Sequence, residues 1–241
     1  MMEKLIEKLA ISHYRKHPGN AESFSLEKAT AKSENILTGK RIIFLGSSVT
    51  YGTASFGESF VDFLEKEDGV LAIKEAVGGT TLVDEKRRGK DSYIARMKNI
   101  DKKIKADCFV CQLSTNDASL SKPLGKISEG IDPEEFDTLT VAGAIEYMIY
   151  FARKTWDCKI LFYTGTKYES RIYEQMVSLL HEIAKKWDIE VLDLWNDEQM
   201  NAVSKEKYRL YMADGIHPSR AGYKEWWTPR FEEKLKEMFR V

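Results

Sequence analysis

Apolar residues follow two different spacings along this chain. Short runs rich in β-branched and aromatic residues alternate with longer stretches in which apolar residues recur at helical spacing. The short runs predict strands and the longer stretches predict helices. The expected strands are residues 41–46, 70–77, 107–113, 159–164 and 190–194, and the expected helices are residues 58–66, 92–105, 137–154, 169–187 and 220–240. This order indicates βαβ units and predicts an α/β fold, a three-layer α/β/α sandwich with a five-stranded parallel sheet.

Residues 1–40 lack this alternation. We expect a helical or irregular extension there, packed on the domain formed by residues 41–241 or on a second copy in a homo-oligomer. Residues 1–15 mix charged and apolar positions as an amphipathic helix does, without the unbroken apolar run of a secretion signal. A cytoplasmic location is therefore the default expectation.

The amino-acid composition gives no support for nucleic acid or a membrane as the binding partner. Lys and Arg number 37 against 38 Asp and Glu, so no global charge favours nucleic acid or an anionic membrane. No stretch approaches the ~18 apolar residues of a membrane-spanning helix. A small molecule is the expected partner.

The three cysteines do not suggest a disulfide framework. Cys108 and Cys111 form a C-x-x-C pattern, but they lie in a predicted strand that would point them to opposite faces. We expect two core cysteines there, because a thioredoxin-like motif needs a helix N-terminus to lower the thiol pKa.

Ser48 follows the first predicted strand, where an α/β sheet binds its ligands. The turn at 46–52 lacks the lysine of a P-loop, the third glycine of a dinucleotide fingerprint and the last glycine of a G-x-S-x-G elbow. A serine at a strand end, beside backbone N–H groups that could stabilise an oxyanion, remains.

His217 is the best candidate base among the four histidines. Asp214 precedes it by three residues in a turn fixed by Pro218, so its carboxylate could accept a hydrogen bond from one ring nitrogen while the other faces the nucleophile. The structural alternative is that both residues only close a turn and cap the following helix.

Four segments together resemble the SGNH (GDSL-like) hydrolases. Residues 46–50, Gly-Ser-Ser-Val-Thr, resemble the family's first block, Gly-Asp-Ser-Leu/Ile-Thr, and residues 76–81, Ala-Val-Gly-Gly-Thr-Thr, resemble the second. Residues 113–117, Leu-Ser-Thr-Asn-Asp, resemble the third block, usually Gly-x-Asn-Asp, and residues 214–218 match the fifth, Asp-x-x-His-Pro. The resemblance runs in the family's order from residue 41 to about residue 223.

The resemblance implies a flavodoxin-like SGNH fold and a serine esterase, lipase or acylhydrolase that needs neither metal nor organic cofactor. Ser48 would be the nucleophile, His217 the base and Asp214 its partner. The N–H groups of Ser48 and Gly79 and the side-chain amide of Asn116 would form the oxyanion hole.

Three departures from the family pattern bear on the site. Ser47 replaces the aspartate before the nucleophile, Lys74 stands where the second block usually has asparagine, and Ser114 replaces the glycine of the third block.

The expected substrate is a short-acyl or acetylated carbohydrate ester. Tyr51, Phe56 or Tyr168 could stack on a sugar ring, although ordinary packing explains each of them as well. The loop at 118–136 is a candidate substrate wall or lid.

The alternatives are a lipid or thioester acylhydrolase, a non-catalytic small-molecule or carbohydrate-binding module on the same fold, and a flavodoxin-like phosphate or nucleotide binder that uses residues 46–52 as an anion nest.

Overall fold

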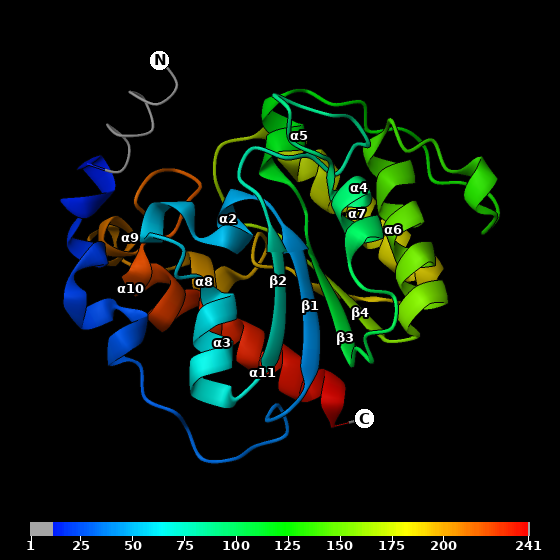
Figure 1. Ribbon diagram of the computed structural model, residues 1–241. Helices are drawn as coiled ribbons and strands as arrows, with labels where there is room; N and C mark the ends of the chain where they lie inside the picture. Colours follow the sequence, from blue (N-terminus) through cyan, green and yellow to red (C-terminus); the bar gives the residue numbers. More distant parts are fainter. Residues whose placement is uncertain (1–11, 241) are drawn as a thin grey trace.

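A computed structural model describes residues 12–240, and its centre is a sheet of five parallel strands (Figure 1). The strands are β1 (Arg41–Gly46), β2 (Leu71–Ala76), β3 (Cys108–Gln112), β4 (Lys159–Tyr163) and β5 (Glu190–Leu192). They lie in the order β2-β1-β3-β4-β5, and every neighbouring pair is parallel. The predicted α/β fold is therefore confirmed, and each strand lies within the residues expected for it.

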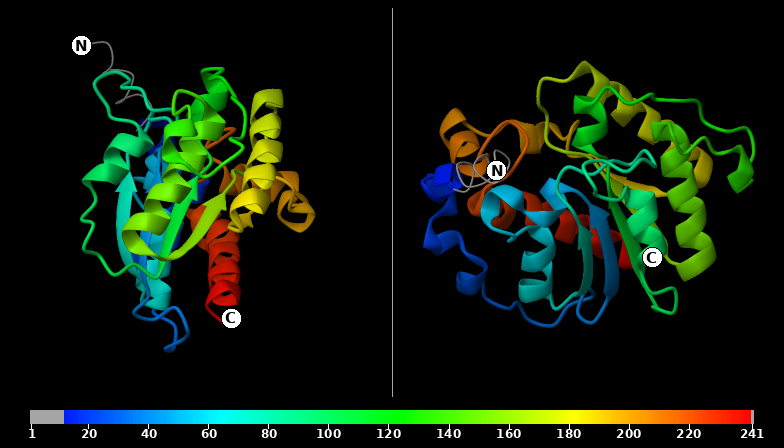
Figure 2. Two further views of the ribbon diagram at one scale, coloured as in Figure 1. Left: turned by 90° about the vertical axis from the view of Figure 1, so that its right-hand side faces the viewer. Right: turned by 45° about the horizontal axis from the view of Figure 1, so that its top comes forward.

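The apolar side chains of β1 show how the sheet divides the core. Ile43 and Leu45 join the apolar cluster beneath α4 (Tyr93–Asn99), α6 (Val141–Trp156) and α7 (Arg171–Trp187). Ile42 and Phe44 join the cluster beneath α3 (Phe60–Asp68) and α11 (Thr228–Phe239). Neighbouring residues of a strand point to opposite faces, so both faces of this strand are buried. Two helical layers enclose the sheet, as Figures 1 and 2 show.

The long helices match the predicted ones, with shifted ends. They are α3 (Phe60–Asp68), α4 (Tyr93–Asn99), α6 (Val141–Trp156), α7 (Arg171–Trp187) and α11 (Thr228–Phe239). Expected helix 92–105 is shorter than predicted, because Ile100 is already extended after α4 and is buried. Expected helix 220–240 consists of α10 (Arg220–Gly222), a π-helical turn η6 (Tyr223–Trp227) and α11.

Within residues 12–240, four short helices were not predicted from the sequence. They are α2 (Ser48–Tyr51), α5 (Thr115–Ser119), α8 (Glu198–Asn201) and α9 (Lys205–Tyr211). With four or five residues each, α2, α5 and α8 are too short to show an apolar period, so tertiary contacts and capping residues define them.

The two cysteines of the C-x-x-C pattern are core residues, as predicted. Cys108 belongs to the cluster beneath α3 and α11, and Cys111 belongs to the cluster on the other face of the sheet. Both side chains are buried, and burial raises the pKa of each thiol well above its ordinary value.

The described part of the N-terminal extension consists mainly of short helical turns that pack against the domain. Its 3-10 turns are η1 (Pro18–Asn20), η2 (Glu22–Phe24) and η3 (Leu26–Lys28). Turn η1 contacts α9 and α10, and η3 contacts α3. Most of the predicted amphipathic helix at 1–15 lies outside the described residues, and residues 12–15 are helical. Within residues 12–240, no helix has the length and apolarity needed to cross a membrane.

Candidate active site

Ser48 begins a short helix directly beyond the first strand. Strand β1 ends at Gly46 and α2 starts at Ser48, so the hydroxyl lies at the carboxyl edge of the sheet. Gly46 has no room for a side chain, because an added Cβ would lie 1.7 Å from the Thr50 hydroxyl oxygen. The close turn brings Ser48 to the surface of a cleft, with 7% of the residue exposed.

Gln112 holds this turn from the neighbouring strand β3. Its side-chain oxygen accepts hydrogen bonds from the Ser47 N–H at 2.9 Å and from the Thr50 hydroxyl at 2.8 Å, and all three residues are buried. Ser47 donates its hydroxyl to the same oxygen at 3.2 Å. Serine in place of the family's aspartate is thus part of an internal hydrogen-bond network. The sequence signal for this network was Gln112 itself, a polar residue in an otherwise apolar strand.

His217 lies in a turn that its own backbone fixes. The Ala213 N–H donates to the His217 carbonyl at 2.9 Å, and residues Met212 and Pro218 form an isolated antiparallel bridge. One Asp214 oxygen accepts from the N–H groups of Ile216 and His217, each at 2.8 Å. The carboxylate is therefore both the cap of the turn and the neighbour of the imidazole.

Ser48, His217 and Asp214 form one continuous hydrogen-bonded series. His217 Nε2 lies 2.8 Å from Ser48 Oγ, and His217 Nδ1 lies 2.8 Å from Asp214 Oδ2. Burial alone would raise the pKa of Asp214, but the hydrogen bond and charge of His217 hold it well below its usual range. In the tautomer that donates its Nδ1–H to the ionised Asp214, the imidazole can accept a hydrogen bond from the Ser48 hydroxyl through Nε2. The structure thus brings together the three residues expected to meet.

Three N–H donors face the same edge of the sheet. Gly79 has φ +82°, a conformation that glycine adopts freely, and among residues 12–240 no acceptor bonds the N–H of Ser48 or of Gly79. The Asn116 amide donates to the Thr80 carbonyl at 2.9 Å, which leaves its second N–H without a bond in the described residues. These are the donors expected from the sequence.

Ser114 explains the third block's departure from glycine. It is the N-cap of α5, and its hydroxyl oxygen accepts from the N–H groups of Asn116 and Asp117 at 3.2 and 3.3 Å. A serine at an N-cap stabilises the first turn of a helix. It therefore fixes the turn that carries Asn116.

Two cations hold the backbone of the Gly78–Gly79 turn. Lys90 Nζ donates to the Gly78 carbonyl at 2.8 Å, and an Arg87 guanidinium nitrogen donates to the Gly79 carbonyl at 3.1 Å. The Gly78 carbonyl and the Gly79 N–H belong to one planar peptide and point in opposite directions. Because Lys90 binds the Gly78 carbonyl, the Gly79 N–H of the same peptide points away from the Lys90 ammonium.

Arg96 and Asp117 are buried supports that the sequence analysis missed. The Arg96 guanidinium donates to the Gly46 carbonyl at 2.8 Å and to the Thr80 hydroxyl at 3.1 Å, so it joins the first and second blocks. Asp117 accepts from the Leu82 N–H at 2.9 Å. Burial raises the pKa of Asp117 to about 6. A charged residue on a predicted apolar helix face was the only signal for Arg96.

Lys74, the remaining departure, does not line the cleft. Its ammonium donates to the Gly57 carbonyl at 2.9 Å and pairs with the Asp62 carboxylate. Burial lowers its pKa. The lysine joins β2 to the start of α3 and, within the described residues, makes no hydrogen bond to Ser48, His217 or Asp214.

The cleft at this edge has a volume of about 860 Å³. It is lined by Ser48, Tyr51, Thr53, Ala76, Val77, Gly78, Gly79, Arg88, Lys90, Thr115, Asn116, Ser119, Ile216 and His217. Figure 2, in its right-hand view, brings this edge of the sheet forward.

Only one of the three aromatic residues considered for sugar stacking lines the cleft. Tyr51 is among the lining residues and is 47% exposed. Phe56 instead packs under the Arg220 guanidinium, 5.1 Å from the ring centre. Tyr168 packs against Trp195 and Tyr173. The positions of Phe56 and Tyr168 favour the packing interpretation.

The loop at 118–136 leaves the cleft soon after it begins. Of its residues only Ser119 lines the cleft. Farther along, the Ser128 N–H donates to the buried Glu146 carboxylate at 2.8 Å, and Lys186 donates to the Ser128 carbonyl at 2.7 Å. These contacts fix the loop on α6 and α7. The expectation of a substrate wall or lid is therefore wrong for all of it but its first residues.

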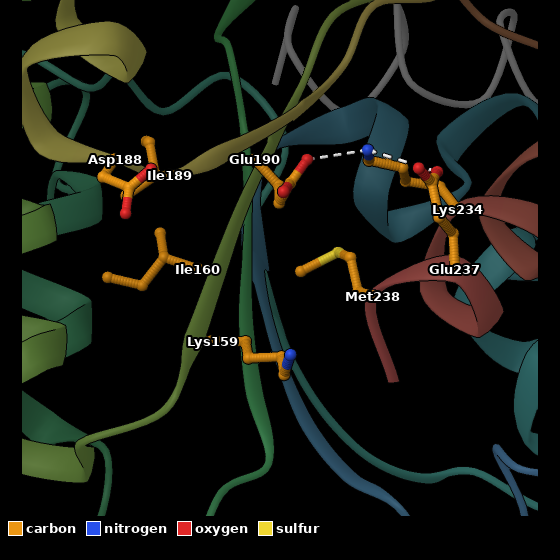
Figure 3. A pocket seen from close by; sticks show the side chains of 8 residues that line it. All are labelled: Lys159, Ile160, Asp188, Ile189, Glu190, Lys234, Glu237 and Met238. Carbon is orange, nitrogen blue, oxygen red and sulfur yellow. Dashed lines mark hydrogen bonds and ion pairs between the residues drawn. The ribbon is translucent and has the colours of Figure 1, made fainter. Parts of the chain in front are cut away.

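A second hollow lies at the opposite edge of the sheet, among the amino ends of β4 and β5 and the end of α11 (Figure 3). Its volume is about 270 Å³, and it is lined by Lys159, Ile160, Asp188, Ile189, Glu190, Lys234, Glu237 and Met238. Its acidic residues do not form a metal site: in the part of the chain that the structure describes, no three His, Cys, Asp or Glu side chains gather in a way that could hold a metal ion.

Solved structures share this fold at low sequence identity. A protein from Lactobacillus plantarum is 19% identical with a TM-score of 0.68, and the match covers 83% of this chain and 98% of that one. A protein from Bacteroides ovatus ATCC 8483 whose name places it with the GDSL-like lipases is 18% identical with a TM-score of 0.57, covering 83% of this chain and 99% of that one. An acetyl xylan esterase is 16% identical with a TM-score of 0.58, covering 81% and 99%.

Comparison with curated proteins finds no significant match. The family model described as GDSL-like Lipase/Acylhydrolase matches residues 42–227, which include every segment that carries the resemblance. The chain belongs to the GDSL-like lipase/acylhydrolase family.

Proposed function

We propose that this protein is a serine esterase that cleaves short-acyl esters, such as acetylated carbohydrates, through an acyl-enzyme. The observation that carries the proposal is the series Ser48 Oγ, His217 Nε2 and Nδ1, and Asp214 Oδ2, with both contacts at 2.8 Å. A hydroxyl becomes a useful nucleophile when a base within hydrogen-bond distance takes its proton.

In the first step Ser48 Oγ forms a bond to the ester carbonyl carbon, and its proton moves to His217 Nε2. The ionised Asp214 stabilises the imidazolium that results. The carbonyl oxygen becomes an oxyanion and accepts hydrogen bonds from the N–H groups of Ser48 and Gly79 and from the Asn116 amide. The bond to the alcohol oxygen then breaks, and that oxygen takes the proton from His217.

In the second step water releases the acyl group. His217 Nε2 takes a proton from water while the water oxygen bonds to the acyl carbon, and the same donors hold the second oxyanion. Ser48 Oγ then leaves with the proton from His217. The products are the carboxylic acid and the original enzyme.

The lining of the cleft supports a small acyl group on a polar alcohol. Its aliphatic side chains are Ala76, Val77 and Ile216, and the described lining contains no Leu, Phe or Trp. Its remaining side chains are mostly hydroxyl, amide and cationic groups, which suit an alcohol with many oxygens. The acetyl xylan esterase with the same fold acts, by its name, on such an ester.

Hydrolysis of 4-nitrophenyl acetate by Ser48→Ala tests the proposed nucleophile. We expect kcat/KM to fall by about 10⁴-fold or more, because no other group replaces the attacking oxygen. Ser178→Ala is the matched control, since that hydroxyl lies on α7 and, within residues 12–240, bonds only to the Glu174 carbonyl. Activity of Ser48→Ala close to that of the unmodified protein would end the proposal.

A fluorophosphonate probe and a substrate series separate the alternatives. Labelling of Ser48 by the probe supports an esterase, and failure to label the folded protein favours a non-catalytic binding module. Acetyl esters of sugars are expected to exceed 4-nitrophenyl esters of eight or more carbons in kcat/KM. The reverse order would identify a lipid acylhydrolase, and faster cleavage of acyl thioesters would identify a thioesterase.

A further inference from the structure

The N-terminal extension reaches the far side of Asp214. The Tyr14 hydroxyl donates to Asp214 Oδ2 at 3.2 Å, across 200 positions of the sequence. Tyr14 is not among the residues that line the cleft. It therefore touches the Ser48 series at its outer end, away from any substrate.

The two oxygens of Asp214 are held differently. Oδ1 accepts from the backbone N–H groups of Ile216 and His217, both at 2.8 Å, and also lies 3.0 Å from His217 Nδ1. Oδ2 accepts from His217 Nδ1 at 2.8 Å and, among the residues described, otherwise only from Tyr14. Rotation of the carboxylate about its own bond would lengthen the shorter contact to the imidazole, the one from Oδ2. The two backbone N–H groups hold Oδ1 against that rotation, and the Tyr14 hydroxyl holds Oδ2.

We infer that Tyr14 is a positioning residue that orients the Asp214 carboxylate toward His217, and that residues 12–20 form part of the active-site framework. This inference rests on the proposed function. It assigns the extension a role that neither the family resemblance nor the fold provides.

Asn20 shows that the extension is built into the site. Its buried side chain donates to the Tyr14 carbonyl at 2.9 Å and to the Ala54 carbonyl at 2.7 Å, and its oxygen accepts from the Arg220 N–H at 2.9 Å. Ala54 follows the Ser48 helix, and Arg220 follows the His217 turn. One side chain therefore connects Tyr14 to both segments that supply the reacting groups.

Gly19 shows how closely the extension fits. A Cβ at this position would lie 1.9 Å from the Leu210 carbonyl oxygen and 2.4 Å from the Ser219 hydroxyl oxygen. Ser219 is the N-cap of α10, immediately before Arg220. This close packing, which only glycine allows, fixes the distance between the extension and the His217 turn.

Tyr14 remains a hydrogen-bond donor over the whole neutral range. Burial and then the charge of Asp214 raise the pKa of Tyr14 to about 12. The other titratable groups that face Asp214 are His217, Tyr208 of α9 and Tyr223 of η6. Tyr223 donates its hydroxyl to the Val49 carbonyl, and the Tyr208 hydroxyl has no bond within the described residues.

Tyr14→Phe tests the inference, with Tyr208→Phe as the matched control. Both replacements remove one hydroxyl near Asp214, but only the first removes a bond to it. We expect Tyr14→Phe to lower kcat for 4-nitrophenyl acetate about three- to tenfold with KM unchanged, a modest effect because the bond is long. Tyr208→Phe is expected to match the unmodified protein.

A double-mutant cycle separates positioning from general support of the fold. If Tyr14 acts through the carboxylate, Tyr14→Phe has no further effect in an Asp214→Ala background. An equal loss in both backgrounds would show that Tyr14 only supports the fold, and an undiminished kcat of the single variant would equally overturn the inference.

A second measurement does not depend on ester hydrolysis. In the inactive Ser48→Ala protein, the proton NMR signal of His217 Nδ1–H reports the bond to Asp214. We expect Tyr14→Phe to move this signal and Tyr208→Phe to leave it in place. A moved signal, together with an unmodified protein that hydrolyses no ester, would contradict the proposed function while supporting the Tyr14 contact. An unmoved signal would contradict the contact itself.

Discussion

The cleft beside Ser48 and the hollow beneath β5 lie at opposite edges of one sheet, and both are lined by charged and polar groups. In the hollow, three of the charged groups pair with one another: Lys234 pairs with Glu190 at 2.7 Å and with Glu237 at 3.4 Å (Figure 3). In the cleft, the N–H groups of Ser48 and Gly79 have no partner within the described residues.

The difference supports the proposal that the cleft, rather than the hollow, receives a ligand. Unpaired donors near a buried surface cost stability, so a fold retains them where a ligand supplies the missing acceptor. Paired charges at the surface need no ligand and contribute little to stability. Shape alone would not distinguish the two places, but their hydrogen bonds do.

The largest expected effect on this comparison comes from Asp214→Asn. We expect kcat to fall about 10⁴-fold, because an amide favours the imidazole tautomer that cannot take the Ser48 proton. The pKa of Asp214 lies below its usual range, so the carboxylate is ionised throughout the pH range of a standard assay.

Asp193→Asn is the matched control for that experiment. Asp193 also lies 2.7 Å from a histidine nitrogen, that of His181, but the pair is outside the cleft. Its loss is expected to leave hydrolysis unchanged. Similar losses in the two variants would mean that the Asp214 contact has no special role.

Asn116→Ala is expected to have the next largest effect. It removes one of the three donors proposed to hold the oxyanion, and one such donor is typically worth about 10²–10³ in kcat. Steady-state kinetics with 4-nitrophenyl acetate measure the loss. A decrease of less than threefold would show that the amide only supports the Thr80 carbonyl.

Lys90→Met is expected to lower kcat about tenfold, since the Gly79 N–H would lose the charge-assisted bond that orients its peptide. Lys86→Met is the control, because Lys86 pairs with Asp91 at the surface, 3.3 Å away. A loss seen equally in both variants would point to the local charge rather than to the peptide.

The smallest expected effect comes from the opposite edge. Lys234→Met breaks the ion pairs of the hollow, and we expect unchanged hydrolysis and a change in the free energy of unfolding of no more than about 1 kcal/mol. Thermal unfolding and the same ester assay check both. A tenfold loss of activity would show that the two edges are coupled and would remove the contrast between them.

Local sequence was enough to predict β1, β3 and β4 because they are strongly apolar, and the alternation of strands and helices helped to place the more polar β2 and β5. Each of the five predicted runs contains a strand of the sheet, and β1 has the predicted bounds. The predicted helices were found from apolar residues at helical spacing, and their ends are displaced by capping and by the return of the chain to the sheet. Short helices such as α2 and α5 were missed because their stability comes from contacts distant in the sequence.

The sequence by itself also determined which side chains are available for chemistry. Ser48 and Asn116 each follow a predicted strand, which places them at the carboxyl edge of a parallel sheet. Asp214 and His217 form a local pattern before the last helix, but their position at that edge depends on the path of the chain after β5. The family's blocks add their order to that prediction.

Only the tertiary structure decided which distant groups complete the site. Gln112 beneath the Ser48 turn, Arg96 between two blocks and Tyr14 behind Asp214 are joined to their partners across 65, 50 and 200 positions. No local period or motif encodes such contacts, because each depends on how the strands are ordered and how the extension folds back. The tertiary structure also decided that Phe56 and Tyr168 pack against other side chains. A residue close to a motif in the sequence faces the cleft only if the local backbone directs its side chain there.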